Sequence, residues 1–479
     1  MPETTRENTA PAQKVRFANP RIAAADEQSL YEVRRKVYPR AVSGVFARWR
    51  WALVILTQVL FYGLAWVQWN GRQAFLLHLS ERKFYIFGWV FWPQDVVYLT
   101  VLLIICAYSL FLFTAVAGRL WCGYACPQTV YTELFLWIER RIEGDRAKRM
   151  KLDNAPPSFV KFATKAAKFG AWGAVALWTG ITFVGYFSPI RELLPNIARF
   201  DLGGWELFWI CFYGGFTYLM AGVMREQVCK YMCPYARFQG VMFDPDTLVI
   251  TYDPERGEPR GAKRKQAEQK LGDCVDCGIC VQVCPTGIDI RDGLQYECIG
   301  CAACIDACDQ VMDKVGSPRG LIRYTTENAM KQHWGMRDVL RHVIRPRVLV
   351  YLSVLLAIIA AGGWSLAHRH TLRVDVIRDR TTLSREVEGG LIENIYTLQM
   401  MNMAETARRI QVSVSGLDGV SLVEAPRFEL PAAGNKSYTI HVRVPVDSAP
   451  KGSHKIVFDI RSEEGDGVKL AEKASFMMP

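Results

Sequence analysis

Long apolar runs dominate the pattern of hydrophobic and polar positions along this chain. At 1.5 Å per helical residue, a run of about 20 residues crosses a hydrocarbon core of ~30 Å. Tryptophan and tyrosine gather at the ends of the runs, where aromatic side chains anchor helices at a membrane surface. The pattern predicts a helical transmembrane bundle of five spans, over residues 51–69, 96–117, 171–187, 206–224 and 348–367.

A shorter apolar stretch, residues 84–92, ends directly before Pro93. It is too short for a span, so we expect a re-entrant or surface-lying segment there. The polar and basic residues 1–48 lack the apolar core and small-residue cleavage site of a signal peptide. We therefore expect an uncleaved N-terminal arm.

Apolar and polar residues alternate in the last part of the chain, as in half-buried β-strands. The alternation is clearest at residues 410–414, 438–444 and 455–460, with glycine, proline and asparagine between them. This spacing predicts an all-β, immunoglobulin-like sandwich without an inter-sheet disulfide. Core packing is favoured over copper binding as the role of the neighbouring thioethers of Met400, Met401 and Met403.

The distribution of lysine and arginine predicts how the chain is oriented. Basic residues are frequent in the N-terminal arm and in residues 118–170 and 225–347, and sparse in residues 188–205. Cytoplasmic loops carry such an excess, so we expect a bacterial inner-membrane protein with a cytoplasmic N-terminus and, after five crossings, a periplasmic C-terminal domain. Arg72, Arg82 and Lys83 fall on the outer side in this scheme, where headgroups can hold them.

Composition agrees with this layout. The net charge of +11 follows from membrane orientation, and no aromatic-basic motif indicates a nucleic-acid partner. All fourteen cysteines lie at or before Cys308, on segments expected in the reducing compartment. The expected domains are an arm (1–48), a membrane unit of four spans (49–240), a cytoplasmic cysteine-rich domain (241–345), a fifth helix (346–368) and the periplasmic sandwich (369–479).

The cysteine-rich domain holds two runs of the spacing Cys-x2-Cys-x2-Cys-x3-Cys. That spacing wraps [4Fe–4S] clusters, with the fourth cysteine of each run ligating the other cluster. Zinc ribbons use pairs of cysteines, so the triplets argue against zinc. Asp309 replaces the proline that usually follows the second run. We assign Cys274, Cys277, Cys280 and Cys308 to one cluster, and Cys298, Cys301, Cys304 and Cys284 to the other.

Four further cysteines form two copies of Cys-x3-Cys-Pro, about a hundred residues apart. Cys122 and Cys126 follow the second apolar run, and Cys229 and Cys233 follow the fourth. Both copies are expected at the cytoplasmic membrane face, where a helical Cys-x3-Cys would place its two thiols on one side. Four thiolates suit Cu(I), zinc or an iron–sulfur cluster, and ligand type does not choose among them. Packing is the favoured role only for the isolated Cys106 and Cys211.

Other redox cofactors have no sequence signature here. None of the seven histidines lies in an apolar run, so no membrane haem is expected, and no glycine-rich dinucleotide fingerprint follows a strand. The electron donor is therefore expected to be another protein, a quinol or a soluble reductant. Four polar residues could line a quinone pocket, although helix capping and interhelical hydrogen bonding are favoured for them. They are Gln58, Tyr62, Gln94 and Asp95.

Taken together, these motifs resemble the CcoG/FixG/RdxA family, accessory proteins of cbb3-type cytochrome oxidase, over nearly the entire chain. The segments that carry the resemblance are residues 91–95, 118–130, 229–234 and 274–285. The resemblance implies a membrane polyferredoxin that reduces Cu(II) to Cu(I) in the cytoplasm for oxidase maturation, with copper chaperones or assembly factors as partners. Copper would then bind at Cys122, Cys126, Cys229 and Cys233.

Two other functions remain open. Membrane ferredoxins that oxidise quinols share the Cys-x3-Cys-Pro repeat but are not expected to carry the sandwich, so this resemblance is weaker. The chain could instead be a non-catalytic scaffold for oxidase assembly, with redox-sensing clusters. The three functions differ in whether the purified protein reduces copper and whether a quinol reduces its clusters.

Overall fold

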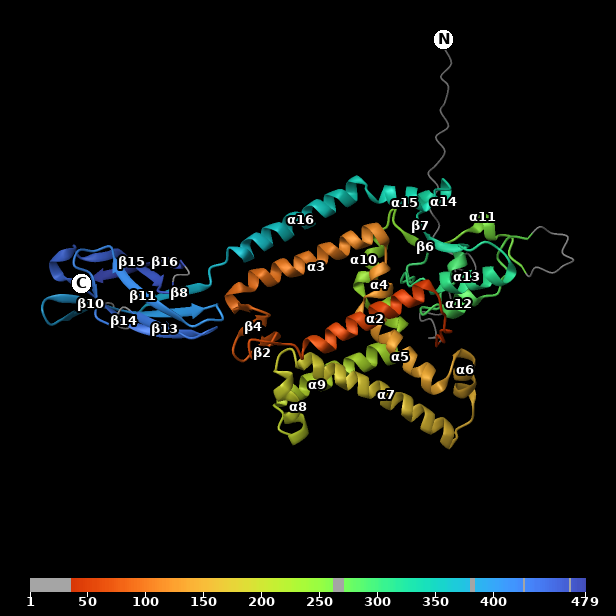
Figure 1. Cartoon of the computed structure of the whole chain (residues 1–479), viewed down its shortest axis with the longest axis horizontal. Helices are drawn as coiled ribbons and strands as arrows, with labels where there is room; N and C mark the ends of the chain where they lie inside the picture. The colour runs from red at the N-terminus through yellow and green to blue at the C-terminus, as the bar shows by residue number, and fades with distance from the viewer. Residues whose placement is uncertain (1–35, 262–270, 380–383, 425–426, 465–466) are drawn as a thin grey trace, which may run out of the picture.

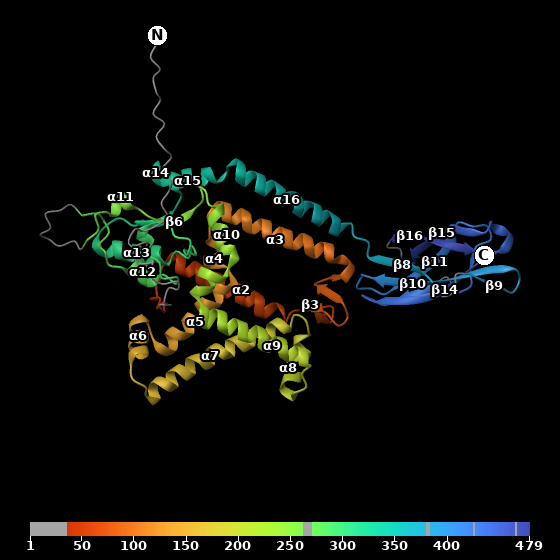
Figure 2. The same ribbon diagram turned by 180° about the vertical axis from the view of Figure 1, so that it is seen from behind.

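The computed structural model describes residues 36–261, 271–379, 384–424, 427–464 and 467–479. The molecule is elongated, with three parts in sequence along its long axis (Figure 1). The cysteine-rich domain lies at one end, the long helices fill the middle, and the sandwich lies at the other end. The view from behind shows the same order (Figure 2).

Five long helices build the central part. Three segments are long and apolar enough to cross a membrane, namely Pro93–Ala117, Gly204–Met224 and Pro346–Ala367. The other two long helices carry arginine or lysine in their first half, which lowers their hydropathy. The five are α2 (Val45–Leu64), α3 (Val96–Ala117), α7 (Phe159–Val184), α9 (Gly204–Thr217) with its π-helical continuation η2 (Tyr218–Met224), and α16 (Pro346–Ala367).

Small residues and end contacts set how these helices pack. A Cβ atom on Gly180 would lie 2.4 Å from the Ile210 carbonyl oxygen, so only glycine lets α7 approach α9 this closely. α3 and α16 run antiparallel: Arg345, just before α16, donates to the Ala115 carbonyl at 2.6 Å. At the opposite ends of the same helices, the Tyr98 hydroxyl contacts Ser365 at 3.3 Å.

The stretch expected to be re-entrant or surface-lying is a small antiparallel sheet. Residues 84–92 form most of β4 (Lys83–Ile86) and β5 (Trp89–Phe91), and β4 pairs with β5 on one side and with β3 (Phe75–His78) on the other. Hydrogen bonds between the strands satisfy the backbone amide groups of this apolar segment. A short run of hydrophobic residues in the sequence does not reveal such strand pairing. The first predicted span also ends early, because Gln68–Trp69 forms β1 and pairs with β2 (Arg72–Gln73).

Short helices connect the long ones at the end nearest the cysteine-rich domain, and one lies at the far end. They are α4 (Leu120–Tyr124), α5 (Pro127–Glu143), α6 (Arg146–Asn154), η3 (Val228–Met232) and α10 (Pro234–Met242), with α8 (Ile190–Arg199) at the far end.

The cysteine-rich domain is built around one two-stranded sheet. Strands β6 (Val249–Tyr252) and β7 (Ile322–Thr325) pair antiparallel and pack with Ile305 and Met312 in a common core. Its helical segments are α11 (Pro254–Gly257), α12 (Ile279–Val283), η4 (Ile290–Asp292), α13 (Ala303–Val315), α14 (Glu327–Lys331) and α15 (Met336–Val343).

A carboxylate fastens this domain to the helical part. Asp306 on α13 accepts hydrogen bonds from the backbone amides of Phe46, at 3.2 Å, and Ala47, at 2.7 Å. It thereby caps the start of α2, whose own N-cap residue, Gly44, has no side chain to do so. A Cβ atom at Gly44 would lie 2.2 Å from the Asp306 side chain, so glycine is required there.

The C-terminal domain is a sandwich of a five-stranded and a four-stranded antiparallel sheet. The first contains β12, β14, β10 and β8 in that order, with β9 also on β10; the second is ordered β13-β11-β15-β16. The alternating segments predicted as strands lie in β11, β14 and β15. The strands are β8 (Leu372–Arg378), β9 (Arg385–Val387), β10 (Leu391–Asn402), β11 (Arg408–Ser415), β12 (Ser421–Leu422), β13 (Arg427–Leu430), β14 (Asn435–Pro445), β15 (Gly452–Ser462) and β16 (Lys469–Met478).

The sandwich core includes one of the methionines weighed as copper ligands. Met400 is fully buried in the core between the sheets, and Met401 and Met403 are each 7% exposed. The Sδ atom of Met403 lies 2.9 Å from an Arg369 guanidinium nitrogen. These buried positions agree with a packing role for the three methionine side chains.

Candidate redox site

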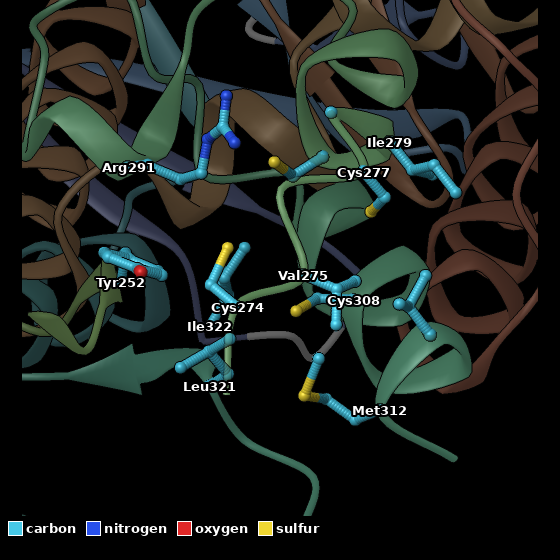
Figure 3. A pocket seen from close by; sticks show the side chains of 13 residues that line it. Tyr252, Cys274, Val275, Cys277, Ile279, Arg291, Cys308, Met312, Leu321 and Ile322 are labelled. Carbon is cyan, nitrogen blue, oxygen red and sulfur yellow. The ribbon is translucent and has the colours of Figure 1, made fainter. Parts of the chain in front are cut away.

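Four cysteines from two separate segments line one cavity in the cysteine-rich domain. They are Cys274, Cys277, Cys280 and Cys308. The first three come from the loop that leads into α12 and its start, and the fourth from α13. Figure 3 shows Cys274, Cys277 and Cys308 around this cavity.

A second cavity lies next to the first and shares Cys280 with it. Cys284, Cys298, Cys301 and Cys304 line it. The structure therefore brings the first three cysteines of each run together with the fourth cysteine of the other run. This is the grouping that the spacing predicts for two [4Fe–4S] clusters.

The backbone around both cavities repeats an unusual conformation. Asp276 and Gly278 flank Cys277 with φ values of 51° and 62°, and Gly300 and Ala302 flank Cys301 with 68° and 57°. Left-handed residues in such loops turn backbone N–H groups toward a common concave space, which favours anions. A thiolate-ligated iron–sulfur cluster is anionic, so the loops and the four-cysteine linings fit two such clusters.

Burial raises the pKa of several of these thiols in the absence of metal. It raises the pKa of Cys280 to about 11, with the nearby Arg291 acting in the opposite direction. Burial likewise raises the pKa of Cys298 and of Cys308 to about 12. A cluster must displace these protons, so ligation is coupled to proton release.

The two Cys-x3-Cys-Pro motifs adopt the same local shape. Cys122 lies on α4 and Cys229 on η3, while Cys126 and Cys233 are the N-cap residues of α5 and α10. The proline after each second cysteine begins the next helix, where a missing N–H costs nothing. Each motif is thus a short helix, a turn and a second helix rather than the single helical face expected.

The motifs converge at the boundary with the cysteine-rich domain. Cys122 and Cys229 both pack against the apolar cluster that contains Ile299 and Cys301. Burial is the main cause that raises the pKa of Cys122 and of Cys229 to about 12, and the neighbouring motif cysteines act in the same direction. Among the described residues, no three cysteine, histidine or acidic side chains are arranged to hold one metal ion.

Gly123 forms the closest contact between a Cys-x3-Cys-Pro motif and a cluster loop. A Cβ atom at this position would lie 2.8 Å from the backbone N and Cα atoms of Cys301. Reciprocally, a Cβ atom on Gly300 would lie 3.1 Å from the Arg119 carbonyl oxygen. Glycine on both sides allows the two backbones to touch.

Two buried polar residues complete this boundary. Arg119, which is 5% exposed, donates to the carbonyl oxygens of Tyr296 and Ala236. The Cys122 thiol donates to Gln239 Oε1 at 3.3 Å, and Gln239 is fully buried. Arg119 and Gly123 lie in the segment 118–130 that carries the family resemblance, but neither that resemblance nor the cysteine spacing predicted their contacts with the cluster domain or the role of Gln239. The sequence signal that could have identified these three residues is their position close to the Cys-x3-Cys-Pro motifs.

The residues considered for a quinone pocket make structural hydrogen bonds instead. Asp95 accepts from the Trp92 amide at 2.9 Å and from Arg369 at 2.5 Å. The Tyr62 hydroxyl bonds Thr179 Oγ1 at 2.8 Å, between α2 and α7. Gln58 Oε1 is buried without a partner among the described residues, and Gln94 is exposed. Capping and interhelical bonding account for Asp95 and Tyr62.

Comparison with known protein families identifies three matching regions. Residues 224–327 match a 4Fe-4S dicluster domain, and residues 99–144 match a 4Fe-4S binding domain. Residues 362–479 match the Ig-like fold found at the C-terminus of FixG, described as a putative oxidoreductase. The 4Fe-4S binding domain match contains Cys122 and Cys126, and the dicluster match contains Cys229 and Cys233, so both Cys-x3-Cys-Pro motifs fall in regions that match iron–sulfur families.

Two curated proteins are similar to this chain over most of their length, and a third over about half of its length. Nitrogen fixation protein FixG of Rhizobium meliloti is 39% identical, covering 84% of this chain and 83% of its own. Protein RdxA of Cereibacter sphaeroides is 37% identical, covering 89% and 92%. The ferredoxin-type protein MauN of Methylorubrum extorquens is 26% identical over 36% of this chain and 49% of its own. A solved FixG-related protein from Vibrio parahaemolyticus is 19% identical, covering 23% of this chain and 97% of its own, with a TM-score of 0.21.

Proposed function

This chain belongs to the CcoG/FixG/RdxA family of iron–sulfur electron-transfer proteins, and on that premise we propose that it reduces Cu(II) to Cu(I) at the cytoplasmic face of the bacterial inner membrane. Two [4Fe–4S] clusters, held by Cys274, Cys277, Cys280 and Cys308 and by Cys284, Cys298, Cys301 and Cys304, would supply single electrons. Cys122, Cys126, Cys229 and Cys233 would receive the copper.

The observation that carries the proposal is the contact between Gly123 and the Cys301 backbone. It joins the loop of the second cavity to the Cys-x3-Cys-Pro motif, and Cys122 and Cys229 lie on the same apolar cluster as Cys301. The first cavity adjoins the second through Cys280. The order of sites from the first cavity to the second and then to the four thiols supports a one-electron relay.

The thiols favour the reduced product. Thiolates are soft ligands and select Cu(I) over Cu(II), so the gain of one electron strengthens binding at this site. Because burial raises the pKa of Cys122 and Cys229 to about 12, both are protonated at neutral pH before copper arrives. Copper binding there would release those protons. The donor that reduces the clusters in the cell is unidentified.

Connectivity supports five spans, with α2 and α7 crossing as well as the three more apolar helices. Asp306 holds the start of α2 at the cysteine-rich domain, while Tyr186, after α7, bonds the Phe61 carbonyl near the end of α2 at 2.5 Å. If α7 did not cross, Cys122 and Cys229 would lie on opposite sides of the membrane. Their packing on one apolar cluster argues against that.

In the cell, the Cu(I) would serve maturation of a cbb3-type cytochrome oxidase, received by a copper chaperone or an oxidase assembly factor. The family assignment supports this role, and the proposed orientation would place the cluster domain in the cytoplasm and the sandwich in the periplasm. The basic residues of the N-terminal arm and of the segment after residue 225 support the same orientation.

A direct test uses full-length protein purified anaerobically in detergent. Its clusters are reduced with dithionite, excess reductant is removed, and Cu(II) is added. Cluster reoxidation is followed by absorbance, and Cu(I) by a chromogenic chelator. We expect one Cu(I) per cluster electron in the wild type, and loss of Cu(I) formation in a variant with Cys229→Ser and Cys233→Ser.

A matched control replaces Cys106 and Cys211 by serine. Both are exposed cysteines on the long helices α3 and α9, away from the Cys-x3-Cys-Pro motifs. This control should reduce copper like the wild type. Full copper reduction by the Cys229/Cys233 variant, with its clusters intact, would refute the proposed copper site.

A second candidate is that the four membrane-face thiols hold a third iron–sulfur cluster that passes electrons to or from a quinol. The match of residues 99–144 to a 4Fe-4S binding domain favours it. In that case the Cys229→Ser/Cys233→Ser variant loses iron as well as activity, and a quinol analogue reduces the wild-type clusters. Copper reduction with unchanged iron content excludes it, and clusters that neither Cu(II) nor a quinol affects would favour an assembly scaffold.

A further inference from the structure

An arginine-rich cavity of about 400 Å³ lies beside the second cluster cavity, and neither the iron–sulfur sites nor the proposed copper site uses it. The N-terminal segment before α2, the first turns of α2, helix α5 and the loop after α12 surround it. Its charged lining is five arginines and one carboxylate, namely Arg40, Arg50, Arg140, Arg141, Arg149 and Glu133.

The acids near this cavity are too few for its cations. Glu133 is shared between Arg140, at 3.2 Å, and Arg50, at 3.8 Å. Arg149 pairs with Glu139 at 3.0 Å. Glu139 is itself shared with two further cations from outside the cavity, Arg225 at 3.0 Å and Lys168 at 3.6 Å. The cavity therefore keeps a large positive surplus.

Two of its guanidinium groups are buried with a donor that has no acceptor within the described residues. Arg50 is only 8% exposed, Arg149 is 1% exposed, and the Nε atom of each has no hydrogen-bond partner, although Arg149 also donates to a carboxylate and a backbone carbonyl. Arg40 and Arg141 are exposed and make no ion pair with any described residue. A buried cationic donor without an acceptor is unfavourable, so the two buried arginines, with the two exposed ones beside them, favour an anion in this cavity.

We propose that this cavity binds the phosphate group of an anionic ligand, either a phospholipid headgroup or a soluble phosphate compound. Guanidinium groups bind phosphate oxygens bidentately, and several of them can share one phosphate. The cavity is large enough for a headgroup or small organic phosphate rather than a bare ion. Basic pockets at the cytoplasmic ends of membrane helices suit acidic lipids in particular.

Two tryptophans give the site an amphipathic wall. The rings of Trp51 and Trp137 line the cavity and contact each other edge to face, with centroids 6.4 Å apart. The Arg141 guanidinium lies 5.4 Å from the Trp137 ring centroid. Such rings suit the headgroup level of a membrane. Val283 and Pro285, which flank Cys284, form the opposite wall, so the bound anion would lie beside the second cluster.

The test titrates full-length protein in detergent with three probes: dihexanoyl-phosphatidylglycerol, dihexanoyl-phosphatidylcholine and inorganic phosphate. Quenching of tryptophan fluorescence and the shift in melting temperature report binding. A variant with Arg40→Gln and Arg141→Gln removes two unpaired cations, and cluster absorbance checks its folding. Arg48→Gln is the matched control, since Arg48 is an exposed arginine on α2 that does not line this cavity.

We expect the anionic lipid to bind at least about tenfold more tightly than the zwitterionic one, and each lost arginine to weaken it about tenfold. The Arg48→Gln protein should bind like the wild type. If millimolar phosphate displaces the anionic lipid, a soluble phosphate suffices; if it does not, the ligand is the lipid headgroup. Equal binding of both lipids, or unchanged binding by the Arg40/Arg141 variant, overturns the proposal.

Discussion

At the scale of single residues, the cysteine spacing carried most of the information about the cluster domain. Spacing sorted eight cysteines into two sets, and the same two sets line the two cavities. It could not reveal Gly123, Arg119 or Gln239, because their roles depend on the folding of α4, α10 and the loop around Cys301 against one another. Each looks ordinary in its own segment.

Replacing Gly123 tests how closely the thiol site must approach the second cluster. In Gly123→Ala the new Cβ atom would lie 2.8 Å from the Cys301 backbone, so one backbone must move. Overpacking of this kind costs about 1–3 kcal/mol. We expect a lower melting temperature and slower reoxidation of the reduced clusters by Cu(II), measured by stopped-flow absorbance.

Gly63→Ala is the control for that substitution. Gly63 lies on α2 and has open space around its Cα atom. Alanine favours a helix over glycine by up to about 1 kcal/mol, so this variant should be as stable as the wild type or more so, with unchanged kinetics. Wild-type stability and reoxidation in Gly123→Ala would show that the contact does not limit transfer.

At the scale of elements, hydropathy located the long helices, and alternation located strands of the sandwich. Both failed for residues 84–92, since a short apolar run does not distinguish a strand from a membrane segment. The short helices α5 and α6 also drew no prediction, although they hold a buried ionic cluster at the face of the helical part. Glu139 on α5 is its centre, pairing with Arg149, Arg225 and Lys168.

Glu139→Gln should therefore be one of the more destabilising single substitutions in the chain. It removes a carboxylate that is 1% exposed and shared by three cations, of which Lys168 alone keeps another carboxylate among the described residues, Glu143 at 2.9 Å. Breaking a buried pair costs about 3–5 kcal/mol. Denaturant unfolding in detergent measures the loss. Glu327→Gln is the control: its pair with Lys331 at 2.6 Å is exposed, and we expect a change of at most about 0.5 kcal/mol.

The same carboxylate gives the stability a predicted pH dependence. Burial alone would raise the pKa of Glu139, but Arg225, Arg149 and Lys168 lower it below the ordinary value. Its contribution is therefore complete above the unfolded-state pKa of about 4.3 and is lost as the pH falls through the lower folded-state pKa. Stability of the wild type should fall across that acidic range more steeply than that of Glu139→Gln, whereas parallel curves would contradict the assignment.

At the scale of the whole molecule, the order of the parts could be predicted, but their attachment could not. The cap that Asp306 provides to α2 joins residues 259 and 260 positions apart in sequence. At the other end, Arg72 and Asn70 both bind Glu405 of the sandwich. In the predicted topology, Arg72 was a basic residue on the outer side of the membrane, where few are expected. Its ion pair with Glu405 explains why a positive charge lies on the side that carries the sandwich.

The number of spans decides whether these attachments are compatible with a membrane. Three segments qualify by hydropathy alone. If only they crossed, the segment between α6 and α7 and the segment between α8 and α9 would share a compartment. Five crossings instead place the first in the cytoplasm with the cluster domain and the second in the periplasm. α7 is the helix that distinguishes the two topologies.

Reporter fusions after Pro156 and after Leu202 measure this difference, because alkaline phosphatase is active only in the periplasm and a green fluorescent protein exported unfolded is dark there. We expect fluorescence without phosphatase activity at Pro156, and the reverse at Leu202. A fusion at Pro479, which both topologies place in the periplasm, controls for expression. Equal results at Pro156 and Leu202 would mean that α7 does not cross, and then Cys122 and Cys229 could not share one copper site.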